Sequence, residues 1–141
     1  MLKKRKNRII LDTNLWISFL ISKRLKKLDT LLYEDNLTLV FSQESLEEFI
    51  EVAKRPKFKK YLLATDLEKV IHLFNVYGEL VEVVSTIELC RDTKDNFLLS
   101  LAIDSKADFL ITGDKDLLTI KKFQMTEILT YTEFETRPRP K

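Results

Sequence analysis

Three aspartates stand where expected strands and helices begin or end. Asp12 ends a short apolar run, Asp114 follows a second apolar run after one glycine, and Asp95 opens an apolar helix. Because ligands of open parallel sheets bind beyond the carboxyl ends of the strands, Asp12 and Asp114 are expected at one edge. Mg²⁺ and Mn²⁺ take carboxylate, water and phosphate oxygens as ligands. The pattern therefore predicts a site for one or two divalent ions, suited to hydrolysis of a phosphodiester.

Each of these acids also has an ordinary structural explanation. Asp12 can cap the helix that follows it, and Asp95, together with Asp92, can complement the positive end of a helix. Asp114 and Asp116 can be turn residues around a glycine. Such matches are common when taken singly, but the set as a whole, at the right ends of the right elements, favours a metal site.

A fourth acid cannot be selected from the pattern alone. The helix expected after Ser42 carries four glutamates, and its apolar periodicity does not distinguish among them. Glu48 falls away from the predicted core face, so a solvated position explains it equally well. The four glutamates are Glu44, Glu47, Glu48 and Glu51.

Strands and helices alternate along the chain, which indicates an α/β fold because parallel strands need helical crossovers. The strands are apolar without alternation, as expected when both faces of a sheet are covered. We predict a three-layer α/β/α sandwich with a central parallel sheet of about five strands. The expected strands lie at residues 8–12, 37–41, 80–84, 109–112 and 127–130. The expected helices lie at residues 14–21, 25–34, 43–55 (between Ser42 and Pro56), 67–77 (closed by Gly78) and 95–106.

Composition limits the class of protein. A chain of 141 residues with 45% apolar residues suits a single domain, expected over residues 1–135, with a loose basic tail at 136–141. The net charge of +2 neither demands nor excludes a nucleic-acid partner. The single cysteine, Cys90, excludes an internal disulfide and fits the cytoplasm. No apolar run approaches the ~20 residues that span a bilayer, so no membrane association is expected.

Four segments, in order along the chain, resemble the PIN-domain family, the nuclease fold of many bacterial and archaeal toxin–antitoxin ribonucleases. Residues 9–14 look like its opening strand and first acid, Asp12, and residues 42–58 are similar to its second block, where an acid precedes an apolar residue. Residues 91–102 resemble its third block and residues 110–118 its fourth. One departure is Thr93, where this branch often has proline.

The resemblance implies a PIN-like fold with Asp12, Glu48, Asp95 and Asp114 as catalytic residues. These four and Asp116 would bind one or two Mg²⁺ or Mn²⁺ ions. The resemblance also implies cleavage of single-stranded RNA and a small antitoxin protein that blocks the site. We therefore predict a metal-dependent endoribonuclease, the toxin of a toxin–antitoxin pair, in which the ion activates water and stabilises the leaving oxygen.

Supporting roles are assigned to neighbours of these acids. Asn14 and Thr112 are expected to orient carboxylates or substrate by hydrogen bonding, with a purely structural role as the open alternative. Asp92 is a further supporting residue beside Asp95. Basic residues near the blocks are candidates for phosphate contacts, with solvated surface charge as the alternative: Lys94, Lys115, Arg55 and Lys57.

Other functions stay open at this stage. The protein can be an RNA-processing PIN nuclease that is not a toxin, an aspartate-based phosphatase or phospho-acceptor domain, or a non-catalytic module that binds RNA or protein. The only histidine, His72, lies on a helix flank, which argues against histidine acid–base catalysis. Homodimers are common among similar proteins, and Leu15, Trp16 and Phe19 are candidates for such an interface.

Overall fold

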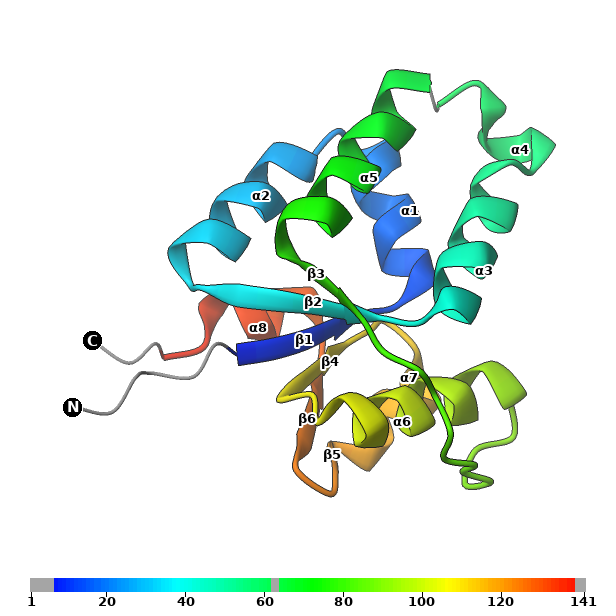
Figure 1. Cartoon of the computed structure of the whole chain (residues 1–141), viewed down its shortest axis with the longest axis vertical. Coiled ribbons are helices and arrows are strands. Elements are labelled where there is room, and N and C mark those ends of the chain that lie inside the picture. Colours follow the sequence, from blue (N-terminus) through cyan, green and yellow to red (C-terminus); the bar gives the residue numbers. More distant parts are fainter. Residues whose placement is uncertain (1–6, 62–63, 139–141) are drawn as a thin grey trace.

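The computed structural model describes residues 7–61 and 64–138, which form a layered arrangement of helices and strands (Figure 1). The strands are β1 (Asn7–Leu11), β2 (Leu37–Phe41), β3 (Gly78–Leu80), β4 (Phe109–Ile111), β5 (Lys122–Phe123) and β6 (Thr126–Leu129). The helices are α1 (Thr13–Ile21), α2 (Leu25–Glu34), α3 (Gln43–Ala53), α4 (Pro56–Lys59), α5 (Ala64–Tyr77), α6 (Thr93–Ser105), α7 (Lys115–Ile120) and α8 (Tyr131–Thr136).

The described strands form one sheet in the order β3-β2-β1-β4-β6-β5. All neighbours are parallel except β5 and β6, which form an antiparallel hairpin. The fold class is therefore confirmed, with six strands where about five were predicted. The additional strand, β5, is two residues long and has no apolar run that marks it in the sequence. Because β1 and β4 are adjacent, their carboxyl ends place Asp12 and residues 112–114 side by side.

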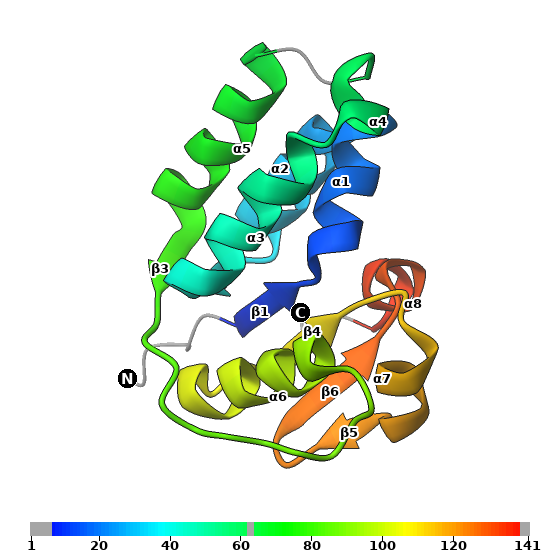
Figure 2. The same ribbon diagram turned by 90° about the vertical axis from the view of Figure 1, so that its right-hand side faces the viewer.

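Each sheet face carries its own apolar core, because successive side chains of a strand point to opposite faces. Ile9 and Leu11 join the core beneath α1, α2, α3, α5 and α8, whereas Ile10 joins the core beneath α6 and α7. Figure 2 shows these two helical layers on either side of the strands. The continuous apolar character of the strands thus has the predicted origin.

Several predicted boundaries are wrong. The third strand was expected at residues 80–84, but pairing with β2 ends at Leu80. Gly78 does not close α5 with a left-handed residue. It is required by space, because a Cβ there would lie 2.3 Å from the Phe74 carbonyl oxygen and 2.7 Å from Phe41. Pro56 does not end the preceding helix but begins α4, where proline needs no hydrogen-bond donor.

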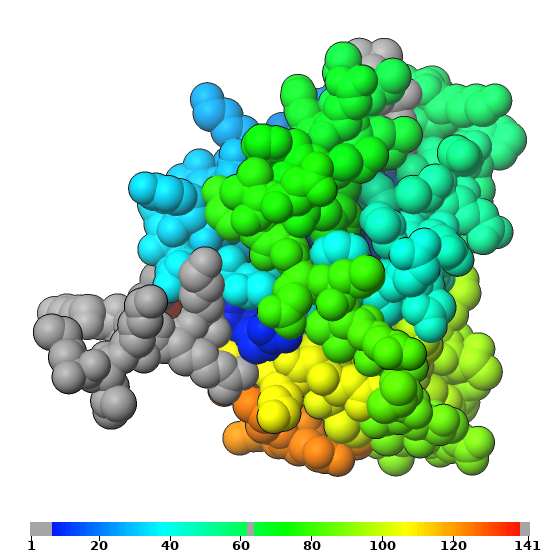
Figure 3. Space-filling model, in the orientation of Figure 1, coloured from blue at the N-terminus to red at the C-terminus, as the bar shows by residue number. Residues whose placement is uncertain are grey.

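The connector between β3 and α6, residues 81–92, is extended and lies across the surface of the lower layer (Figure 3). Its inward apolar side chains pack against the core beneath α6, and two α6 side chains hold its backbone. The Asp104 carboxylate accepts from the amides of Val84 and Ser85 at 2.6 and 2.8 Å. The Asn96 side chain accepts from the amides of Leu89 and Cys90 at 3.0 and 2.7 Å. Two side chains of α6 therefore hold the connector at two points, residues 84–85 and residues 89–90, before the chain enters α6.

The end of the chain is described as far as Pro138. Thr136 is the last residue of α8, and the Arg137 guanidinium stacks on Phe134, with 3.7 Å from its carbon to the ring centroid. Residues 139–141 of the predicted loose tail lie outside the described residues. Trp16 and Phe19 are buried in the core of this chain, so the predicted use of these two side chains at a dimer interface is wrong. Among the described residues, no helix is long and apolar enough to cross a membrane.

Candidate metal centre

A polar cleft of about 530 Å³ opens at the carboxyl ends of the central strands, between the first turns of α1 and α6 and one face of α3. Four predicted site residues line it: Asp12, Glu48, Asp95 and Asp114. They come from four elements separated widely in sequence, and the parallel topology brings them to one edge of the sheet. The cleft therefore gathers the acids that the sequence placed at strand ends and helix starts.

Thr112 links the acids of the two central strands. Its hydroxyl, on a side chain that is 1% exposed, donates to Asp12 Oδ2 at 2.7 Å and accepts from the Asp114 amide at 3.0 Å. Asp12 stands at the N-cap position of α1, and its side chain makes no capping hydrogen bond of regular geometry. Burial raises the pKa of the Asp12 carboxyl above its usual value, against the lowering effects of Thr112 and the Asn14 amide. Negative charge on Asp114 and Glu48 raises this pKa further.

Asp95 is the most deeply buried acid of the cleft, at 5% exposed. Its Oδ2 atom is buried and has no hydrogen-bond partner among the described residues. Burial, followed by the negative charge of Asp114, Asp92 and Asp12, raises the pKa of Asp95 to about 6. A buried carboxylate oxygen without a donor is costly, and a bound cation would offset this cost.

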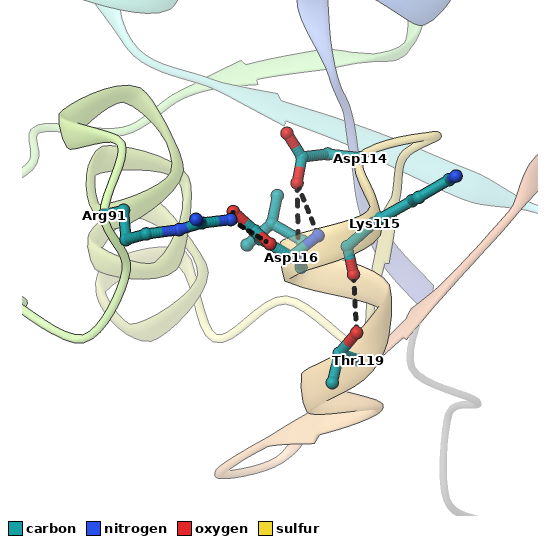
Figure 4. A network of polar contacts seen from close by, with 6 residues as sticks. Arg91, Asp114, Lys115, Asp116 and Thr119 are labelled. Carbon is teal, nitrogen blue, oxygen red and sulfur yellow. Dashed lines mark hydrogen bonds and ion pairs between the residues drawn. The ribbon is translucent and has the colours of Figure 1, made fainter.

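Asp114 and Asp116 complete a compact oxygen cluster with Asp95. One carboxylate oxygen from each of the three lies within 4.8 Å of the others, the largest such grouping found in the described part of the chain. Asp114 Oδ1 accepts from the amides of Asp116 and Leu117 at 2.8 and 3.2 Å, so this oxygen caps α7. Asp116 is held on the other side by Arg91, whose Nη2 atom lies 3.1 and 3.0 Å from its two oxygens (Figure 4).

Glu48 reaches the cleft from α3, which begins at the predicted N-cap Ser42. The Ser42 hydroxyl accepts from the Ser45 amide at 3.0 Å, and this cap sets where the helix starts. One Glu48 oxygen accepts from the Thr13 hydroxyl at 3.2 Å, and the other lies 3.0 Å from Lys94 Nζ. Glu48 is thus turned toward the strand that carries Asp12, rather than toward bulk solvent.

Four of the remaining predicted residues line the cleft, whereas Lys57 and Lys115 do not. Asn14 and Asp92 line the cleft, and the Asp92 carboxylate also caps α6 by accepting from the Lys94 amide at 2.9 Å. Lys94 and Arg55 line the cleft as well. Sequence reasoning missed Thr13 and Arg91, both next to predicted residues in the chain. Hydroxyl and guanidinium groups beside an acid are too common to be selected without a fold.

The donor set fits a hard divalent cation. All candidate ligands are carboxylates, and the most buried one, Asp95, carries an oxygen without a hydrogen-bond partner in the described part of the chain. The negative charge of neighbouring acids raises the pKa of Asp12 and of Asp95. A cation among them would remove this mutual repulsion. Asp12, Glu48, Asp95, Asp114 and Asp116 are the residues that would hold one or two ions.

Comparison with known proteins points in the same direction. The profile of the PIN domain matches residues 8–116, a range that includes every candidate ligand. An uncharacterized protein of Methanocaldococcus jannaschii, MJ1680, is 31% identical over 123 residues, which cover 85% of this chain and 79% of that protein. PIN domains are generally metal-dependent nucleases, in agreement with the acidic cluster of the cleft. This chain therefore belongs to the PIN domain family.

Proposed function

We propose that this protein is a Mg²⁺- or Mn²⁺-dependent endoribonuclease that hydrolyses phosphodiester bonds of single-stranded RNA. The observation that carries the proposal is the buried Asp95 Oδ2 atom, which has no hydrogen-bond partner within residues 7–61 and 64–138 and lies among further carboxylates at the carboxyl edge of the sheet. When bound, the ion supplies a water of lowered pKa and a positive charge for the phosphoryl oxygens.

The residues of the cleft have distinct tasks in this proposal. Thr112 fixes the spacing of Asp12 and Asp114 because its hydroxyl contacts both residues. Thr13 holds Glu48 so that its carboxylate faces the same cleft. In this proposal a single strand of RNA enters through the open side of the cleft. The acids of the cleft repel its phosphates until a cation neutralises them. Cleavage therefore requires the ion both for binding the strand and for the reaction.

The first experiment measures cleavage of a labelled single-stranded RNA with Mn²⁺, with EDTA, and by Asp12→Asn with Mn²⁺. We expect cleavage only in the first sample. Equal cleavage in all three would reject metal catalysis at this site. Formation of an aspartyl-phosphate from a small phosphodonor would instead favour a phosphatase or phospho-acceptor domain. A melting temperature that millimolar Mn²⁺ does not change would favour a non-catalytic module.

We further propose that the protein acts in the cytoplasm as the toxin of a toxin–antitoxin pair. Its family membership supports this role, and a cleft lined by acids offers a basic antitoxin segment an electrostatic partner. Co-expression with the product of an adjacent short reading frame tests the role. A stable complex in which RNA cleavage is blocked is the expected result, and cleavage without such a partner and without growth arrest would favour an RNA-processing enzyme. Sedimentation of the same samples tests whether the protein forms the homodimer that its resemblance to similar proteins suggests.

A further inference from the structure

Two of the acids that are candidate metal ligands form ion pairs with basic side chains of one short segment, residues 91–94. Arg91 makes its two contacts with Asp116, and Lys94 pairs with Glu48 at 3.0 Å. The partner of Arg91 belongs to α7, and the partner of Lys94 belongs to α3. Glu48 in the cleft and Asp116 in the adjoining oxygen cluster therefore already have positive partners, whereas the buried Asp95 Oδ2 atom has none among the residues described.

These two ion pairs are suited to exchange. The side chains of Arg91 and Lys94 are 88% and 63% exposed, and ion pairs this exposed contribute little to stability. The backbone that carries them is fixed, because Asn96 holds the preceding residues and Asp92 caps α6. The cationic side chains can therefore leave their carboxylates while their Cα atoms stay at the rim of the cleft.

A divalent ion would compete with both side chains for the same oxygens. A carboxylate that ligates a cation interacts less favourably with a guanidinium or ammonium group, because the two positive charges repel each other at such short distances. The displaced side chains would then lie beside a cleft whose negative charge has been neutralised. A phosphate group entering the cleft would meet two cations without carboxylate partners, of which arginine offers planar, forked donors.

We propose that Arg91 and Lys94 exchange partners during function. They hold Asp116 and Glu48 while no divalent ion is present, and they bind phosphates of the RNA strand once an ion has taken those carboxylates. This inference rests on the proposed metal-dependent ribonuclease activity. It predicts that ion binding and RNA binding strengthen each other through these two side chains.

The experiment measures binding of a short labelled oligouridine by fluorescence anisotropy, in EDTA and in Ca²⁺, for wild type, Arg91→Gln, Lys94→Gln and Lys115→Gln. Ca²⁺ takes the same kinds of oxygen ligands, and gel analysis verifies that the RNA stays intact. We expect Arg91→Gln and Lys94→Gln to weaken RNA binding about tenfold in Ca²⁺ and to leave it nearly unchanged in EDTA. Lys115→Gln removes the same charge beside Asp114 and Asp116, and its effect should be similar under both conditions.

Calorimetric titration of Mn²⁺ without RNA gives an independent readout. Arg91→Gln and Lys94→Gln should bind Mn²⁺ about two- to fivefold more tightly than wild type, because no side chain competes with the ion. Losses of RNA affinity that are equal in EDTA and Ca²⁺, or Mn²⁺ affinities that match those of Lys115→Gln, would overturn the exchange. If wild type itself binds neither ion, the proposed function fails first, so the two failures are distinguishable.

Discussion

Asp66 and Asp95 form an instructive pair, because both are acids in the first turn of a helix and both are 5% exposed. Asp66, on α5, lies at a second cavity of about 610 Å³ and accepts from Lys23 Nζ at 2.9 Å. Asp95, on α6, lies at the acidic cleft, and its Oδ2 atom has no partner among the described residues. Burial is the same in the two regions, but the source of the counter-charge differs.

The difference separates an acid whose counter-charge lies in the same chain from an acid surrounded by like charges. A buried carboxylate with a cation in the same chain is satisfied when folding ends. A buried carboxylate surrounded by other acids is satisfied either by a proton at low pH or by a cation from outside the chain. The exposed fraction alone does not distinguish these cases, so each buried acid has to be judged by its partners.

The largest expected effect of this difference is on catalysis. Asp95→Asn removes a ligand and should lower the rate of RNA cleavage by more than about a hundredfold. Asp66→Asn changes an acid of equal burial, far from the cleft in the fold, and should retain cleavage within about threefold at a temperature where it stays folded. Initial rates with Mn²⁺ in excess measure both variants. Similar losses in the two would show that the contrast has no functional meaning.

The second effect is on the pH dependence of stability without divalent ions. The pKa of Asp95 is about 6 in the folded chain against an ordinary value of 3.8, so between these values the folded state retains a proton that the unfolded state has lost. The free energy of unfolding should therefore fall as pH rises from about 4 to 6, by up to about 3 kcal/mol, and then level off. The raised pKa of Asp12 adds to the fall.

Urea unfolding in EDTA across this pH range measures the effect. The difference between wild type and Asp95→Asn isolates it, because the asparagine does not titrate while all other acids are shared. A constant difference from pH 4 to pH 7 would contradict the raised pKa.

The third effect is stabilisation by the ion. Mn²⁺ at about one hundred times its dissociation constant should raise the free energy of unfolding of wild type by about 2.7 kcal/mol. Asp66→Asn should gain the same amount, and Asp95→Asn should gain much less. Urea unfolding with and without Mn²⁺ at neutral pH provides the values, and equal gains in all three proteins would place the ion away from the cleft.

The smallest effect concerns stability through Asp66. Asp66→Asn weakens the ion pair with Lys23 and should destabilise the fold by about 2 kcal/mol without ions. Asp95→Asn should be stabilising under the same neutral, ion-free conditions, because it removes a buried charge surrounded by like charges. Opposite signs for two isosteric changes at equal burial sharpen the comparison, and equal signs would remove it.

Much of the fold and part of the cleft follow from the sequence by simple rules. Apolar strands followed by acids predict that Asp12 and Asp114 meet at one edge, because parallel neighbours align their carboxyl ends. Glu48 does not follow, since four glutamates share its helix and only the packing of α3 on α1 turns this one toward Thr13. That rotation depends on contacts between residues distant in sequence, which periodicity does not encode.

The connector at residues 81–92 shows a second limit of pattern reading. Its apolar residues predict a strand at 80–84, and the backbone there is indeed extended. The Val81 amide still donates to Phe41, the last residue of β2, but beyond it the amides of Val84 and Ser85 donate to Asp104 instead of to a neighbouring strand. Apolar character reports that a segment is buried, but it does not report what accepts its hydrogen bonds. Arg91 was missed for the same reason, since its reach toward Asp116 depends on the course of this connector.

The bond between Thr112 and Asp12 joins residues 100 positions apart, and the Asp12 amide donates to Ile111 in the same region. A ribosome adds about 5–20 residues per second, so roughly 5–20 seconds pass between synthesis of the first acid and of its partner strand. During that interval the nascent chain can pair β1 with β2, but the centre is incomplete. The order of the strands thus delays completion of the acidic centre until most of the protein has been translated.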